Sequence, residues 1–71
     1  MNIAKSIKLA LIHTDMEQKE LARRMGVTKQ FVSGLSTGSR PASINMVKRL
    51  AEALEYKVSD FIALGEEEKA A

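Results

Sequence analysis

Cysteine and tryptophan are absent from the 71 residues, and histidine, proline and aromatic residues are scarce. Without cysteine neither a disulfide nor a thiolate metal site can form, and His13 alone cannot hold a metal ion. No apolar run approaches the roughly 18 residues that a membrane-spanning helix needs, and the first residues lack the pattern of a secretory signal. We therefore expect a soluble cytoplasmic protein without a cofactor, a metal or a small-molecule ligand.

Signals for β-strands are weak as well, because the sequence has no sustained alternation of apolar and polar residues and no Asn-Gly or Asp-Gly pair. A chain of this length holds one domain at most. A core of this size contributes only about 3–5 kcal/mol of net stability. We therefore expect packing between helices to stabilise the chain, with self-association as an aid.

Apolar residues recur at helical spacing along most of the sequence. The pattern predicts five helices, over residues 3–14, 17–25, 29–36, 44–54 and 59–64. Asn2, Thr28 and Ser43 are the expected N-cap residues of the first, third and fourth helices. Gly26 is expected to end the second helix with a left-handed backbone, and Gly65 is expected to stop the fifth.

One face of each predicted helix is apolar and defines a candidate core. In the first four helices the inward residues are Ile3, Ile7, Ala10, Leu11, Thr14, Leu21, Ala22, Met25, Val32, Leu35, Ile44, Val47, Leu50, Ala51 and Leu54. Residues 36–43 form the one real loop. The predicted fold class is all-α, a compact five-helix bundle in a single domain over residues 1–65, followed by a charged, frayed tail over residues 66–71.

The net charge of +2 is unevenly distributed. Residues 1–49 contain nine lysines and arginines against three acidic residues, a net charge of +6, whereas residues 50–71 contain two against six, a net charge of −4. A basic front part and an acidic rear part suit a polyanion that docks on one side. An ordinary solvated charge pattern explains the same distribution, so charge alone does not decide between the two interpretations.

The second and third predicted helices form an informative pair. Residues 17–25 and 29–36 predict two helices of about eight residues, joined by a turn of three or four residues that contains Gly26. Such a turn crosses the helices steeply and leaves the second one protruding. Because an α-helix fits the major groove of B-DNA, which is ~12 Å wide, the pair favours binding to double-stranded DNA.

Several short motifs around this pair stand at the spacing of a known family. They are residues 16–22 (MEQKELA), 25–28 (MGVT), 31–35 (FVSGL), Gly38, Arg40-Pro41 and 50–54 (LAEAL). With these motifs the chain resembles the lambda-repressor-like family, the Cro and repressor type of helix-turn-helix, over about residues 3–64. The resemblance implies the fold of that family and a phage or bacterial transcriptional regulator, such as a repressor, that binds a specific DNA sequence.

Candidate phosphate contacts surround the predicted helix pair. The resemblance implies that Gln18 binds a backbone phosphate at the start of the second helix, where free N–H groups and the helix dipole favour an anion. A solvated first-turn side chain is the alternative for Gln18. We expect the remaining phosphate contacts from Lys19, Thr28, Thr37, Ser39 and Arg40. Arg23 and Arg24 are equally compatible with exposure to solvent, with offsetting the helix dipole and with contacting DNA.

The third predicted helix resembles the recognition helix of the family. Its candidate base-reading residues are Lys29, Gln30, Ser33 and Gly34. Gln30 can pair with adenine, and Lys29 can donate to guanine, although a nonspecific phosphate contact suits Lys29 nearly as well. Phe31 is expected to pack on the domain, because the bases of a duplex are not exposed for stacking.

Several positions depart from the family's usual residues. Many members pair an arginine in the first helix with a glutamate after the third. This chain has Leu11 and Ser36 at those positions, so both charges are absent and no buried charge is left without its partner. Gly34 has no side chain with which to read a base, so part of the specificity would come from DNA shape. Glu17 replaces the usual Ser or Thr cap. Glu55 replaces a glycine after the fourth helix, where we expect strain or a different turn.

The expected partner is a pseudo-palindromic DNA operator, bound by a twofold homodimer that forms in solution or on the DNA, in association with the nucleoid. The expected dimer contacts are Tyr56, Val58, Phe61 and Ile62. Leu9 and Ile12 form the rival surface. A protein-interaction module on the same fold, such as an antitoxin or an anti-repressor, is the alternative function. An enzyme is disfavoured, because no recognisable catalytic set is present.

Overall fold

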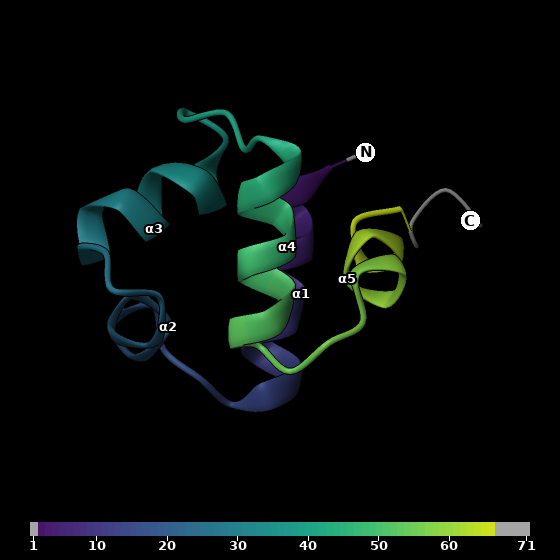
Figure 1. Ribbon diagram of the computed structural model, residues 1–71, viewed down its shortest axis with the longest axis horizontal. Helices are drawn as coiled ribbons and strands as arrows, with labels where there is room; N and C mark the ends of the chain where they lie inside the picture. The colour runs from purple at the N-terminus through teal and green to yellow at the C-terminus, as the bar shows by residue number, and fades with distance from the viewer. Residues whose placement is uncertain (1, 67–71) are drawn as a thin grey trace.

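The computed structural model describes residues 2–66, and within this range it contains helices and loops but no β-strand. The helices are α1 (Ile3–Thr14), α2 (Gln18–Met25), α3 (Lys29–Thr37), α4 (Ile44–Ala53) and α5 (Val58–Leu64). Figure 1 shows α2 and α3 on one side of α1 and α4, and α5 on the other side. Each helix begins and ends within one residue of its predicted bounds, so the prediction of five helices in an all-α fold is confirmed. Beyond residue 66, the predicted tail lies outside the described residues.

Local sequence signals set most of the helix ends. The side-chain oxygens of Asn2, Thr28 and Ser43 accept hydrogen bonds of 3.1–3.2 Å from backbone N–H groups three residues later, which is how N-cap residues satisfy the first turn of a helix. Gly26 ends α2 with a left-handed backbone, φ 72°. Glu55, after α4, also has a left-handed backbone, φ 62°. The strain expected at this non-glycine position is therefore present.

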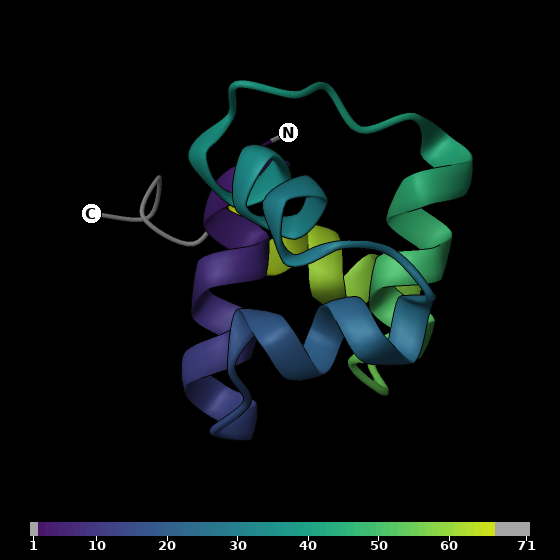
Figure 2. The same cartoon turned by 90° about the vertical axis from the view of Figure 1, so that its left-hand side faces the viewer.

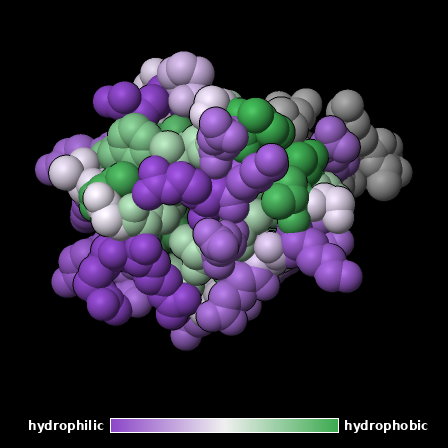
Figure 3. Space-filling view, viewed as in Figure 1, coloured by the Kyte–Doolittle hydropathy of each residue, from purple (hydrophilic) through white to green (hydrophobic). Residues whose placement is uncertain are grey.

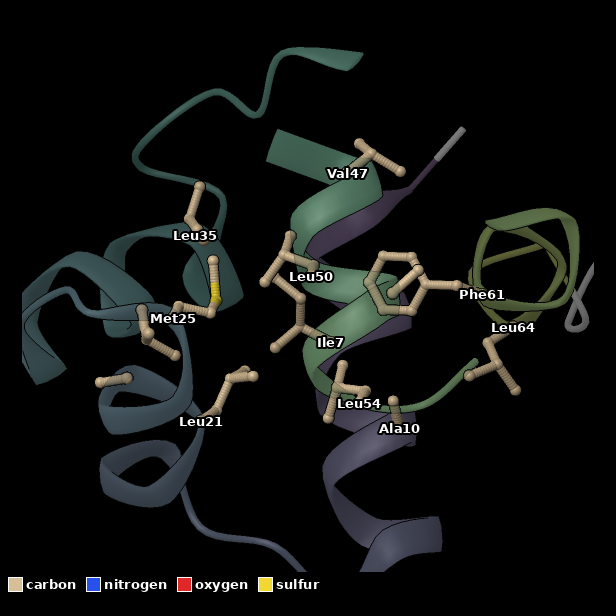
Figure 4. Packing of buried hydrophobic residues seen from close by; sticks show 13 residues of the cluster. Ile7, Ala10, Leu21, Met25, Leu35, Val47, Leu50, Leu54, Phe61 and Leu64 are labelled. Carbon is tan, nitrogen blue, oxygen red and sulfur yellow. The ribbon is translucent and has the colours of Figure 1, made fainter. Parts of the chain in front are cut away.

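The core lies where the five helices meet (Figure 4). Its buried apolar residues are Ile7, Ala10, Leu21, Ala22, Met25, Val32, Leu35, Val47, Leu50, Ala51, Leu54, Phe61 and Leu64. Ile3 and Leu11 are half-buried and pack against this cluster.

Two residues of the predicted core are exposed. Ile44 is 57 % exposed, because it is the first residue of α4, whose start lies at the edge of the molecule where the chain leaves the loop after α3 (Figure 2). Thr14 is exposed at the last turn of α1, where its hydroxyl donates a hydrogen bond of 2.7 Å to the carbonyl oxygen of Ala10. Helical spacing assigned both residues to the right helix but did not reveal that no neighbouring helix covers these ends.

The end of α5 packs closely against the start of α1. Gly65 follows α5 with an ordinary right-handed backbone, φ −74°. A Cβ atom on Gly65 would collide with the carbonyl oxygen of Asn2 and lie 2.6 Å from the hydroxyl oxygen of Ser6. Glycine is therefore required here for space, and not for a left-handed backbone.

Candidate nucleic-acid interface

The helices α2 and α3 form a unit with a short turn. Gly26 reverses the chain, and the N–H of Val27 donates to the carbonyl oxygen of Ala22 at 3.0 Å. The two helices pack against each other, and Figure 2 shows α3 crossing above α2. The helix-turn-helix expected from the sequence is thus present, with α3 at the surface of the molecule.

The helix α3 has one buried face and one open face. Val32, Leu35 and Ser36 are buried, because they face α1 and α2, which both contact α3. The predicted base-reading residues Lys29 and Gln30 are exposed in the first turn. The other two, Ser33 and Gly34, are half-buried further along the helix. The open face therefore carries its long polar side chains only at its start.

Gln18 connects α2 to α3 by a chain of hydrogen bonds that was not predicted from the sequence. Its side-chain Nε2 donates to the hydroxyl oxygen of Ser36 at 3.1 Å, and that hydroxyl donates to the carbonyl oxygen of Ser33 at 3.0 Å. Ser36 is buried and Gln18 is half-buried. One N–H of the Gln18 amide is thus used inside the protein, and Gln18 fixes the start of α2 against α3.

The first turn of α2 has no side-chain cap. Glu17 precedes the helix with an extended backbone and makes no side-chain hydrogen bond to it, whereas Thr28 caps α3. The N–H groups at the start of a helix carry the positive end of its dipole, and Lys19 is exposed in the same turn. This end of α2 therefore presents uncapped donors and one cationic side chain.

The segment after α3 folds back onto the helix. The hydroxyls of Thr37 and Ser39 lie 3.3 and 3.4 Å from the carbonyl oxygen of Gly34, and both residues are exposed. The guanidinium carbon of Arg40 lies 4.8 Å from the centroid of the Phe31 ring. Phe31 is half-buried and packs against the core, in agreement with the expectation that it packs on the domain.

The cationic residues late in α2 have partners within the protein. Arg23 and Arg24 donate to the carboxylate of Glu20 at 2.6–3.2 Å, and these hydrogen bonds, from Arg23 first, lower the pKa of Glu20. Arg24 also donates to the carbonyl oxygen of Ala53 at 3.4 Å. These contacts make Arg23 and Arg24 structural residues of α2 in the absence of DNA.

A second connection between α2 and α4 was not predicted from the sequence. Arg49 donates a hydrogen bond of 2.6 Å to the carbonyl oxygen of Met25, the last residue of α2. A cation at this position also interacts favourably with the negative end of the helix dipole. The only sequence signal was a basic residue on the polar side of α4, which does not identify its partner.

The surface expected to form a dimer is partly internal. Phe61 is fully buried in the core, with its ring 6.5 Å from that of Tyr56 in an edge-on arrangement. The prediction that Phe61 contacts a second copy is therefore wrong for this fold, because α4 and α1 already cover it. Tyr56, Val58 and Ile62 are half-buried. On the rival surface, Leu9 is half-buried and Ile12 is 71 % exposed.

Residues 2–66 hold neither a membrane-spanning helix nor a metal-binding cluster of side chains. No helix in this range is long and apolar enough to span a membrane. The same residues contain no group of three or more His, Cys, Asp or Glu side chains that could hold a metal ion.

Comparison with known proteins agrees with the geometry of α2 and α3. A family model described as helix-turn-helix matches residues 7–61. No curated protein matches the chain. The match covers more than half of the chain and contains the whole of α2, the turn and α3. The chain therefore belongs to the helix-turn-helix family of the Cro and repressor type, a family of DNA-binding proteins.

Proposed function

We propose that this protein is a prokaryotic or phage transcriptional regulator that binds a specific DNA operator with α3 in the major groove. The observation that carries the proposal is the division of α3 into two faces. Val32, Leu35 and Ser36 hold one face in the protein, while Lys29 and Gln30 are exposed at the start of the helix. Lys and Gln side chains can donate to base edges in the major groove.

Phosphate contacts on either side of α3 would position the helix. Lys19 and the uncapped first turn of α2 offer donors on one side, and Thr37 and Ser39 offer hydroxyls on the other. Thr28 can donate its hydroxyl proton while its oxygen caps α3. Gln18 can use its second amide N–H while the first holds Ser36. Contacts of this kind fix the register of a protein on DNA.

We propose that two copies bind a pseudo-palindromic site. Apolar side chains gather over the start of α4 and over α5, whereas hydrophilic side chains cover α2 (Figure 3). Tyr56, Val58 and Ile62 are the half-buried residues of this region that a partner would cover. Because one small domain buries only roughly 600–1,000 Å² on DNA, a twofold pair raises both affinity and specificity.

A protein-interaction module on the same fold is the second candidate function. It is favoured by Ile12, which is 71 % exposed on α1 and would suit an apolar contact with a protein. Antitoxins and anti-repressors are examples of this class. A protein that acts only through such a surface would not bind duplex DNA. The two candidate functions therefore predict different results with a labelled DNA duplex.

Fluorescence anisotropy with a labelled random duplex tests the proposal. The logarithm of the binding constant should fall linearly with the logarithm of the salt concentration, with a slope of about −0.9 for each phosphate neutralised. Lys19→Ala should make the slope less negative by about one unit. Lys57→Ala is the matched control, because it removes a cation from the start of α5, on the other side of α1 and α4. A slope near zero for the wild-type protein would overturn the proposed function.

A further inference from the structure

Gly34 is covered by the chain that follows α3. The backbone N–H of Arg40 donates to the carbonyl oxygen of Gly34 at 3.1 Å. A Cβ atom on Gly34 would lie 3.3 Å from the Cβ of Arg40, and 3.6 Å from both its Nε and the hydroxyl oxygen of Ser39. Because Gly34 has no side chain, the Arg40 side chain can lie directly against the helix at this position.

From Gly34 the Arg40 side chain runs back along the helix to Phe31. Its guanidinium carbon lies 4.8 Å from the centre of the Phe31 ring, a distance at which a cation is attracted to the face of an aromatic ring. Phe31 and Gly34 are three residues apart, so they share one side of α3. Arg40 forms no ion pair with any of the described carboxylates, and the residue is exposed.

A guanidinium that lies face-on over an aromatic ring keeps its edge free for hydrogen bonds. The five N–H donors of arginine lie in the plane of the group and match two acceptors side by side. In the major groove the O6 and N7 atoms of guanine form such a pair. A side chain already held by Phe31 also loses less freedom when it binds.

We propose, on the basis of the function proposed above, that Arg40 serves as the missing base-reading side chain at Gly34 and recognises a guanine in the major groove. Phe31 is the positioning residue that holds the guanidinium along α3. Arg40 was expected from the sequence to bind a phosphate. The fork of arginine also matches two oxygens of a phosphate, but a phosphate contact is the same for every sequence, whereas a contact with guanine changes the affinity at one base pair.

Selection of binding sites from random DNA, followed by affinity measurements on single-base variants, tests this assignment. Arg40→Lys keeps the charge and removes the fork. It should reduce the preference for guanine at one base pair by about 5- to 150-fold, with little change in affinity for random duplex or in the salt slope. Phe31→Leu, which keeps an apolar side chain, should reduce the same preference at the same base pair. Arg23→Lys is the matched control, because its guanidinium is bound to Glu20.

Replacement of that guanine by 7-deazaguanine provides a second measurement. Loss of the N7 acceptor should weaken binding of the wild-type protein severalfold and leave binding of Arg40→Lys almost unchanged, and circular-dichroism melts should show that the variants are folded. Equal weakening of all sequences by Arg40→Lys, or no effect, would overturn the assignment to guanine and leave the proposed function standing. A wild-type protein that selects no sequence would overturn both.

Discussion

Gln18 on α2 donates a hydrogen bond of 3.1 Å to the hydroxyl of Ser36, a buried residue near the end of α3. The two residues are 18 positions apart, and their contact joins the two helices of the helix-turn-helix. The Ser36 hydroxyl in turn donates a hydrogen bond to the carbonyl oxygen of Ser33. A half-buried side chain that was expected to face DNA therefore also sets the spacing between α2 and α3.

Ser36→Ala should lower the free energy of unfolding by about 1 kcal/mol, because it removes both hydrogen bonds of a buried hydroxyl and leaves the Gln18 amide without this partner. Urea denaturation of the wild type and the variant measures the difference. Thr37→Ala is the control on the same helix, since water can replace the bonds of its exposed hydroxyl. Equal stability of the Ser36 variant and the Thr37 variant would show that the Gln18–Ser36 contact contributes nothing to the fold.

Gln30→Ala and Gln18→Ala should affect DNA binding in different ways. Loss of Gln30, which is exposed at the start of α3, should reduce discrimination at one base pair by about 1–3 kcal/mol and spare binding to random duplex. Loss of Gln18 should weaken binding to all sequences alike. Affinities for a panel of single-base variants of the selected site separate the two patterns. Identical profiles for both variants would contradict the placement of α3 in the groove.

Glu55→Gly should stabilise the protein. The backbone of Glu55 is left-handed, φ 62°, which costs a residue with a side chain about 1–2 kcal/mol relative to glycine. The variant loses an ion pair with Arg24 at 3.6 Å, which is exposed and contributes little. We expect a net gain of about 1 kcal/mol in thermal or chemical denaturation. Glu52→Gly, within α4, is the control and should instead destabilise the helix by about 1 kcal/mol. A loss of stability at both positions would argue against strain at Glu55.

The pH dependence of stability should contain a contribution from Glu20. Hydrogen bonds from Arg23 and Arg24 lower the pKa of Glu20 below its ordinary value of 4.5, so the folded protein favours the ionised carboxylate. This contribution is present above the pKa of the unfolded chain and is lost as the pH falls through the lower pKa of the folded state. NMR titration of the Glu20 carboxyl should find the lowered pKa, and Arg23→Ala should move it back upward. A pKa at or above the ordinary value in the wild type would contradict the two hydrogen bonds.

The features that depend on near neighbours in the sequence could be predicted. The caps formed by Asn2, Thr28 and Ser43 bond to N–H groups only three residues away, and helical spacing identified most of the core. Such local signals do not show which helix covers a given face. Phe61 was therefore assigned to a partner although it lies in the core, and Ile44 was assigned to the core although it is exposed.

The same distinction between local signals and contacts between separate segments applies to the candidate site. Exposure of Lys29 and Gln30 follows from helical periodicity, and the structure agrees. The contact between Gln18 and Ser36 and that between Arg40 and Phe31 depend on how separate segments fold against each other. The sequence contained the residue types for both contacts, but an amide and a hydroxyl, or a guanidinium and a ring, have many alternative partners along a chain.

The tight fit of Gly65 against Asn2 and Ser6 has a consequence for synthesis of the protein on the ribosome. Ser6, Ile7 and Ala10 are fully buried, and α5 packs on the helix that carries them. Since α1 is made before α5, this side of α1 stays uncovered by α5 while the intervening helices emerge. The nascent chain can form α2, the turn and α3 early. Its native packing is completed only after α5 and Gly65 have left the exit tunnel.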